Sequence, residues 1–257
     1  IDNVAKTHVF EDLGYATMRD GWEANDVGMS FKSGPYGGAK LNEYRNLNGY
    51  HYINVAHDDP DANSFLIYAR GQMLAKPDAY SYTKLTSGHN TILVNGDGQH
   101  GEGGQWTQPL GSPHQDMTQL AEMTWHEQRG DISIVEGEAG GSYDGLSRYR
   151  RTTVFSEGKY ILVLDDIRSD SQTPRSITWL VQGDDVDVID APNGEFALRS
   201  GGVSMPFTLI GNVTPSTTIT TSTARNRSTL LGLEQLQATA STTQWRTVAM
   251  FDAWGLG

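Results

Sequence analysis

The sequence of 257 residues contains no cysteine and few positive charges for its length. Without cysteine it can form neither a disulfide framework nor a thiolate zinc site. Lysine and arginine number 19 against 31 aspartates and glutamates, which gives a formal net charge of −12. This acid excess argues against nucleic acid as a partner, because a nucleic-acid surface needs a basic stripe. An anionic substrate would need basic residues that gather locally.

Long hydrophobic runs are also missing. No apolar stretch approaches the roughly 18 residues that a membrane-spanning helix needs, so we expect no membrane partner. Hydrophobic residues make up 37% of the chain, which suffices for a globular core. The length fits one large β domain or two smaller ones.

Long stretches with helical periodicity are absent, whereas Gly, Thr, Ser, Asn and Asp punctuate the chain at intervals of roughly 8 to 12 residues. This spacing is typical of all-β proteins. We predict strands at Gly14–Arg19, Asp26–Lys32, Ser64–Ala69, Asn90–Asn95, Ile132–Glu138, Tyr149–Phe155, Tyr160–Ile167, Ser176–Gln182 and Thr247–Asp252.

The clearest hairpin signal joins Tyr149–Phe155 to Tyr160–Ile167 through a turn that contains Gly158. The second strand is a nearly continuous apolar run, so we expect it to be buried on both faces. The segment Leu230–Thr239 is predicted as a short helix or, equally, as a pair of strands. The threonine-rich segment Thr214–Thr223 predicts a solvated β edge, since β-branched Thr suits a pleated surface.

An acidic, turn-rich stretch over Gly183–Gly202 predicts a soft boundary in the chain. It separates a central β-sandwich over residues 1–182 from a smaller C-terminal β layer over residues 183–257. No Ser/Gly-rich or Pro-rich linker joins the two parts, so we expect them to pack together.

Two histidines stand in polar clusters that border apolar β runs. His57 lies in the first cluster and is followed by Asp59, and His89 lies in the second, with Asp78 between them. Strand ends beside tight turns are where sheet proteins place functional sites. These four side chains could supply N and O ligands to a divalent metal from three neighbouring strand ends.

These clusters resemble the C-terminal β domain of the heparinase II/III-like polysaccharide lyases, a group that includes alginate and oligoalginate lyases. The resemblance covers roughly residues 50–170 and rests on His57–Phe65, Tyr68–Gly71, Lys76–Asp78, His89–Asn95 and the hairpin Arg150–Asp166. It implies an antiparallel β supersandwich of two layers. In the family a helical (α/α) toroid precedes this domain, and we expect these residues to be the β part only, lacking the toroid.

The resemblance also implies roles for single residues. His57 takes the position of a catalytic acid or base, and Asp59, Asp78 and His89 take the positions of metal ligands. Zinc is the expected metal, with calcium or manganese as alternatives because oxygen-rich coordination tolerates them. Many members of the family have His-x-His in the first cluster, where this sequence has Asp59 in the second His position.

The implied reaction is β-elimination in a polysaccharide with 1,4-linked uronic acid, either alginate or a glycosaminoglycan. The uronate carboxylate must be neutralised before a base takes the neighbouring proton and an acid protonates the leaving oxygen. Histidine can do either near neutral pH. Among the tyrosines, Tyr50, Tyr52, Tyr80 and Tyr82 are local candidates for this work or for packing on the sheet, and family members draw a further Tyr from the toroid.

We expect Arg70, Tyr80 and Arg148 to contact substrate, because a guanidinium can bind a carboxylate bidentately. The expected partners are an acidic polysaccharide and a helical toroid of the same protein, in the periplasm of a bacterium or outside the cell. The alternative is a carbohydrate-binding or structural β-sandwich module without chemistry of its own. Such a module has no reason to cluster His and Asp across three strands.

Overall fold

The structure is a computed structural model that describes residues 4–49, 57–104 and 117–256. It is an antiparallel β supersandwich, which confirms the predicted fold class. A five-stranded sheet in the order β1-β2-β3-β4-β5 holds the N-terminal strands. Its strands are β1 (Thr7–Phe10), β2 (Tyr15–Arg19), β3 (Val27–Lys32), β4 (Ser64–Ala69) and β5 (Gln72–Ala75).

The largest sheet has eight strands in the order β12-β13-β14-β19-β10-β9-β8-β7. In chain order these are β7 (Glu122–Arg129), β8 (Ile132–Glu138), β9 (Leu146–Ser156), β10 (Tyr160–Ser169), β12 (Asp185–Asp190), β13 (Glu195–Ser200), β14 (Val203–Gly211) and β19 (Gln244–Asp252).

A four-stranded sheet has the order β15-β18-β11-β6, and a separate pair joins β16 to β17. These strands are β6 (Ile92–Val94), β11 (Arg175–Gly183), β15 (Ser216–Thr221), β16 (Arg225–Asn226), β17 (Thr229–Leu230) and β18 (Glu234–Thr242). The helical elements of the described residues are the α-helix α1 (Ala39–Leu47) and the 3₁₀ turns η1 (Glu11–Leu13), η2 (Thr86–Gly88), η3 (Met117–Gln119), η4 (Gly140–Ser142) and η5 (Ala191–Asn193). None of them is both long enough and apolar enough to span a bilayer.

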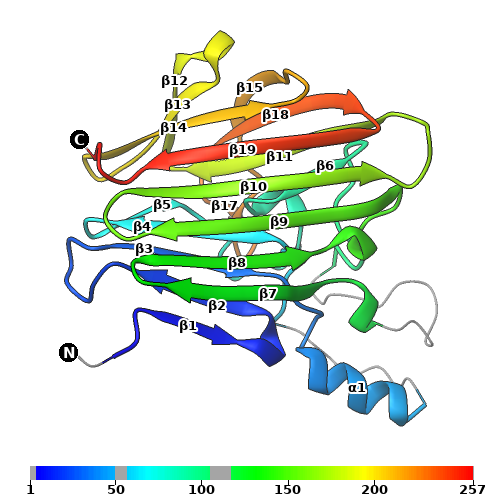
Figure 1. Ribbon diagram of the computed structural model, residues 1–257. Helices are drawn as coiled ribbons and strands as arrows, with labels where there is room; N and C mark the ends of the chain where they lie inside the picture. Colours follow the sequence, from blue (N-terminus) through cyan, green and yellow to red (C-terminus); the bar gives the residue numbers. More distant parts are fainter. Residues whose placement is uncertain (1–3, 50–56, 105–116, 257) are drawn as a thin grey trace.

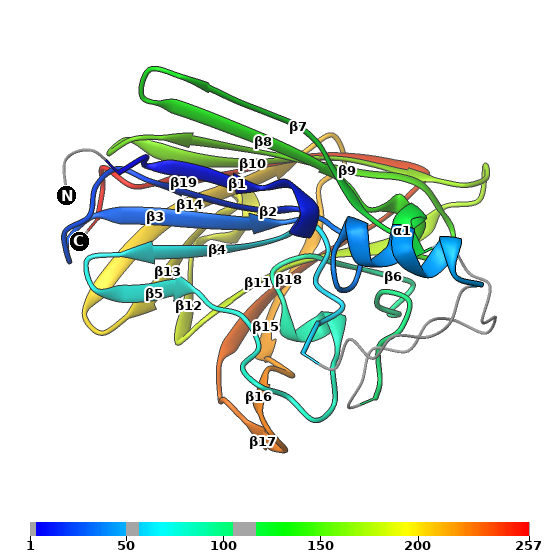
Figure 2. The same ribbon diagram turned by 90° about the horizontal axis from the view of Figure 1, so that it is seen from below.

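The eight-stranded sheet forms one layer, and the five-stranded and four-stranded sheets lie against its inner face (Figures 1 and 2). Phe65 of β4 joins the layers, because its ring contacts both Trp179 of β11 and Phe251 of β19 at centroid distances of 6.1 and 5.7 Å. The buried hydrophobic residues of all three sheets form one continuous cluster.

The predicted boundary near Gly183 crosses these sheets. β10 precedes the boundary and pairs along its whole length with β19, which follows it. The four-stranded sheet likewise combines β6 and β11 with β15 and β18. The division into 1–182 and 183–257 therefore describes the order of the chain, and both parts contribute to the same sheets and the same core.

The predicted hairpin is present, and β9 and β10 pair in register from Tyr160 and Ser156 onward. The expectation that its second strand is buried on both faces is wrong. Residues of β10 alternate between buried and half-buried along the whole strand, because its outer face belongs to the open side of the large sheet. Leu162 and Leu164 lie on that half-buried face.

The segment predicted as a short helix or a strand pair is a strand, since most of it belongs to β18. The threonine-rich segment forms β15, an exposed strand at the edge of its sheet, as predicted. The α-helix lies elsewhere, at α1. Only Asn42 and Arg45 of this helix are buried, so the sequence shows no apolar stripe that would have revealed it.

An ion pair between Arg151 of β9 and Asp165 of β10 lies at the centre of the sandwich, and both side chains are fully buried. Arg151 donates two hydrogen bonds to the carboxylate, at 2.7 and 2.9 Å. Burial opposes its charged form, but the Asp165 carboxylate holds the pKa of Arg151 above its usual value. The third guanidinium nitrogen donates to the backbone oxygens of Asn63 and Asn90.

We predict that Asp165→Asn lowers the free energy of unfolding by about 3–5 kcal/mol, because it leaves the Arg151 charge buried without a counter-ion. Denaturant titration followed by circular dichroism measures this loss. The matched control is Asp170→Asn, which removes the carboxylate from a solvent-exposed pair with Arg175 and should leave stability nearly unchanged. Equal stabilities for the two variants would show that the buried pair does not hold the layers together.

Candidate metal centre

Three of the predicted site residues come together in the structure. The side chains of Asp59, Asp78 and His89 each offer a ligand atom, and these atoms lie within 4.8 Å of one another. Asp78 and His89 are buried, whereas Asp59 is half-buried. The three residues come from separate loops: the one before β4, the one after β5 and the one before β6.

The loop that carries His89 is fixed by its neighbour Asn90. The Asn90 amide donates to the backbone oxygens of Phe65 at 2.8 Å and Lys76 at 3.0 Å, and its oxygen accepts the N–H of Gln182 at 2.9 Å. Asn90 thus ties β4, the segment after β5 and β11 to one point. The position of the His89 ring is set by this framework.

The His89 ring has an unusual environment. Its Nε2 is buried and has no hydrogen-bond partner among the described residues. A buried polar atom without a partner costs about 1–3 kcal/mol, so such an atom points to a ligand. An imidazole nitrogen beside two carboxylates is a donor set that zinc and related divalent ions accept. The three residues therefore fit a metal ion.

Backbone N–H groups hold the side-chain carboxylate of Asp78 in place. Its Oδ1 accepts the N–H groups of Ala79, at 2.9 Å, and of Arg225 in β16. Burial raises the pKa of Asp78, and the hydrogen bonds and the nearby His89 oppose that shift. Because both of these hydrogen bonds use Oδ1, Oδ2 is the oxygen that can face an ion.

Lys84 is part of this cluster and was missed by the sequence analysis. Its side chain is 1% exposed, and its ammonium donates to Asp59 Oδ1 at 2.7 Å. The backbone of Lys84 is paired with Gly103 and Gly104, which fixes its place beside the carboxylates. In the sequence Lys84 is the only charged residue between Asp78 and His89, and this was the available signal.

His57 is exposed and stands beside the cluster in sequence, with its ring 5.4 Å from that of Tyr80. Tyr80 contacts Tyr82 edge to face at 6.0 Å, and both tyrosines are exposed, at 44% and 39%. The structure thus brings the predicted catalytic His57 and the predicted substrate contact Tyr80 together at the surface. Tyr50 and Tyr52 lie outside the described residues.

The other two predicted substrate contacts lie elsewhere. Arg70 sits in the turn after β4, with φ of +49°, and β4 begins at the end near Asp59. A six-residue strand is roughly 20 Å long, so Arg70 is at the far end of it. Arg148 lies on the outer face of the large sheet and donates to Asp166 at 3.0 Å. Neither arginine joins the three candidate ligands.

The loop before β4 is anchored to the five-stranded sheet by charge. Lys32 of β3 binds Asp58 and Asp61, which flank Asp59, with the bond to Asp61 at 2.6 Å. Although burial works against the ammonium, Asp61 and Asp58 hold the pKa of Lys32 above its usual value. These two ion pairs keep the loop that carries His57 and Asp59 at one end of β3.

Residues 3–246 match the sequence family described as heparinase II/III-like, C-terminal. The chain belongs to this family. Its fold is similar to that of a heparinase III, with a TM-score of 0.72 and 15% sequence identity over 96% of this chain and 36% of that chain. It is also similar to the heparan sulfate lyase HepC from Pedobacter heparinus, with a TM-score of 0.69, 16% identity and 96% and 36% of the two chains covered. This heparinase II/III-like chain spans little more than a third of the length of these structures.

We predict that added Zn²⁺ raises the melting temperature of this heparinase II/III-like domain and that His89→Ala abolishes the rise. An ion that binds only the folded state adds stability by mass action, about 2.7 kcal/mol at a hundred times the Kd. Differential scanning calorimetry and metal analysis of the purified protein check this. His126→Ala removes an exposed histidine on β7 and should keep the full response. A wild-type protein indifferent to Zn²⁺, Ca²⁺ and Mn²⁺ would contradict the metal site.

Proposed function

We propose that this chain is the β portion of a polysaccharide lyase that cleaves a 1,4-linked uronate polysaccharide by β-elimination. The observation that carries the proposal is the meeting of Asp59, Asp78 and His89 beside His57 in a member of this family. A glycosaminoglycan is favoured over alginate, because the solved structures similar to this chain include a heparan sulfate lyase.

In this proposal His57 transfers a proton at the scissile link. Its ring is exposed, so a polysaccharide can reach it, and histidine exchanges protons near neutral pH. Tyr80 lies against His57 and can orient its ring or contact the sugar. Lys84 adds a positive charge at Asp59.

Asp59, Asp78 and His89 would hold a divalent metal, with zinc preferred and calcium or manganese as alternatives. Such an ion supplies positive charge, which can steady a developing oxyanion or the loops around it. The chain's own contribution is to keep these three side chains and His57 at one end of the sandwich.

The neutralising groups for the uronate carboxylate are expected from a helical toroid of the same protein. Two cations near the described site, Lys32 and Lys84, are already paired with aspartates. We therefore propose that an acidic polysaccharide binds between this domain and the toroid. We also propose that the protein is a periplasmic or secreted bacterial enzyme, because such a location suits a polysaccharide substrate.

The second candidate is a carbohydrate-binding module without catalysis. The observation that favours it is the Lys84–Asp59 pair, which already balances one carboxylate of the cluster without a metal. Exposed aromatic rings at Tyr80 and Tyr82 suit binding alone. A module of this kind would bind polyuronates and release no unsaturated product.

We predict that His57→Gln in the full-length protein lowers kcat at least about a hundredfold, because proton transfer is lost. The melting temperature should stay unchanged, because the His57 ring is exposed and lies against the ring of Tyr80, which is exposed as well. The assay follows the ultraviolet absorbance of unsaturated products across a panel of polyuronates. His126→Gln is the matched control and should turn over as the wild type does. A His57→Gln protein with most of its kcat would assign His57 to structure and move the search for the base to the tyrosines.

We also predict that the 257 residues by themselves show little or no lyase activity and gain it when joined to the helical part. The two lysines beside this cluster, Lys32 and Lys84, are paired with aspartates and are therefore not free to neutralise a uronate. The same absorbance assay, run on the isolated chain and on the full-length protein, measures the difference. Robust turnover by the isolated chain would show that the site is complete without a partner domain.

A further inference from the structure

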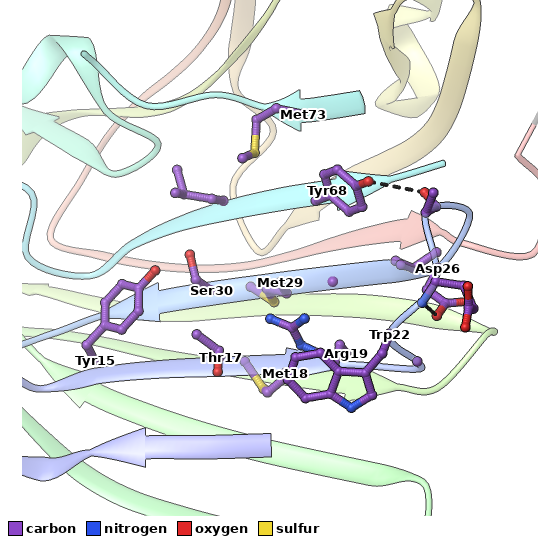
Figure 3. Close-up of a pocket in the computed structure, with 16 residues that line it drawn as sticks. Tyr15, Thr17, Met18, Arg19, Trp22, Asp26, Met29, Ser30, Tyr68 and Met73 are labelled. Carbon is purple, nitrogen blue, oxygen red and sulfur yellow. Dashed lines mark hydrogen bonds between the residues drawn. The ribbon is translucent and has the colours of Figure 1, made fainter. Parts of the chain in front are cut away.

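The outer face of the five-stranded sheet carries a hollow of about 480 Å³, lined by β2, β3, β4, β5 and the loop between β2 and β3 (Figure 3). This volume lies within the range of small-molecule sites, roughly 300–1,000 Å³. Thr17, Gly28 and Ser30 lie on its floor, where these small residues leave the hollow open. A Cβ built on Gly28 would meet only ordinary contacts, the nearest at 3.5 Å, so glycine leaves open space that a side chain would fill.

Arg19 and Trp22 form one wall of the hollow. The Arg19 guanidinium carbon lies 4.0 Å from the centroid of the Trp22 ring, which is a cation–π contact. Within residues 4–49, 57–104 and 117–256, this guanidinium has no hydrogen bond or ion pair. In Figure 3 it points into the middle of the hollow, between Thr17 and Trp22. Trp22 is 38% exposed, so part of its ring is open to a ligand.

The loop that carries Trp22 is held in place before any ligand arrives. Asp20 accepts the N–H of Val27 at 2.8 Å, and the Tyr68 hydroxyl donates to the backbone oxygen of Ala24 at 3.1 Å. A Cβ on Gly21 would lie 2.1 Å from an Asp26 carboxylate oxygen, so a larger residue there would displace the Asp26 side chain. A preformed wall reduces the entropy lost on binding.

Two acidic residues, Glu23 and Asp26, line this end of the hollow, and both belong to the loop between β2 and β3. Asp26 accepts the N–H of Glu23 at 2.5 Å and packs against Gly21. Figure 3 shows Asp26 at the end of the hollow, away from the Arg19 guanidinium. The Arg19 guanidinium therefore brings a positive charge to the centre of the hollow, although the chain as a whole is acidic.

The hollow shares a strand with the candidate metal centre. Gly28, Ser30 and Lys32 alternate with buried residues along β3 and so face the same side of the sheet. Lys32 binds Asp58 and Asp61 in the loop that carries His57. With a rise of about 3.3 Å per residue, Gly28 lies roughly 13 Å from Lys32, which gives a polymer a path from one site to the other.

We propose that this hollow is a second saccharide-binding site, which holds an acidic sugar unit of the polysaccharide away from the point of cleavage. The exposed part of the Trp22 ring packs on the apolar face of the sugar, and the Arg19 guanidinium binds the carboxylate bidentately. The hydroxyls of Thr17 and Ser30 donate hydrogen bonds to sugar hydroxyls and accept hydrogen bonds from them. The choice of an acidic sugar rests on the proposed function.

The test uses an unsulfated tetrasaccharide that contains hexuronate and the 257-residue chain. In NMR spectra of ¹⁵N-labelled protein, the indole N–H signal of Trp22 should shift on titration and that of Trp254, which is 79% exposed, should not. Arg19→Gln should weaken binding about tenfold or more, since hydrogen bonds to a charged group are lost. Trp22→Ala should abolish it, whereas Arg129→Gln and Trp254→Ala, both at exposed positions, should bind as the wild type does.

A tetrasaccharide whose carboxylates have been reduced to alcohols should bind wild type and Arg19→Gln equally weakly. Wild-type affinity in both Arg19→Gln and Trp22→Ala, or an unmoved Trp22 signal, would overturn the site. The outcome is separable from the proposed function, which the full-length protein tests by release of unsaturated product. Binding at Trp22 without such release would support the site and contradict the lyase.

Discussion

The bidentate pair of Arg151 and Asp165 is the contact on which the arrangement of the sandwich depends. Asp165 also accepts from Trp179 in β11 at 3.0 Å and from Thr247 in β19 at 3.2 Å, so one carboxylate joins the two layers. Arg151 reaches across to the backbone oxygens of Asn63 and Asn90. These two residues stand in the two His clusters, and the pair therefore connects the core directly to the candidate site.

The charged residues around the candidate site are also paired with neighbours of opposite charge. The chain is strongly acidic, yet two lysines lie within the first cluster and its surroundings: Lys32 holds Asp58 and Asp61, and Lys84 holds Asp59. Each pair brings together segments far apart in the sequence. The paired lysines fix the aspartates and leave little positive charge for a substrate, whereas the Arg19 guanidinium stacks on Trp22 with no carboxylate as its partner among the described residues.

The sequence predicted the strands whose side chains alternate clearly, such as Ser64–Ala69 and Ile132–Glu138, with the same bounds as the structure. It missed β7, whose residues are mostly exposed and polar, and α1, which buries only polar side chains. Burial against another layer stabilises these elements weakly, so their sequences carry little periodic signal. The turn-rich stretch after Gly183 hid β12 and β13 for a different reason, since short strands around tight turns resemble a loop in composition.

The three candidate ligands were predictable because each is next to an apolar strand. The position of Lys84 beside Asp59, and the distance of Arg70 and Arg148 from the cluster, depend instead on how the strands run in space. Lys84 changes the charge of the cluster. Two carboxylates and one ammonium leave a net charge of −1 when His89 is neutral, and the His89 Nε2 still lacks a partner. A lysine can balance one aspartate but cannot satisfy an imidazole acceptor while it donates to Asp59 alone. The remaining negative charge and the unpaired nitrogen together support the proposed divalent metal ion, which is cationic and accepts the lone pair of an imidazole nitrogen.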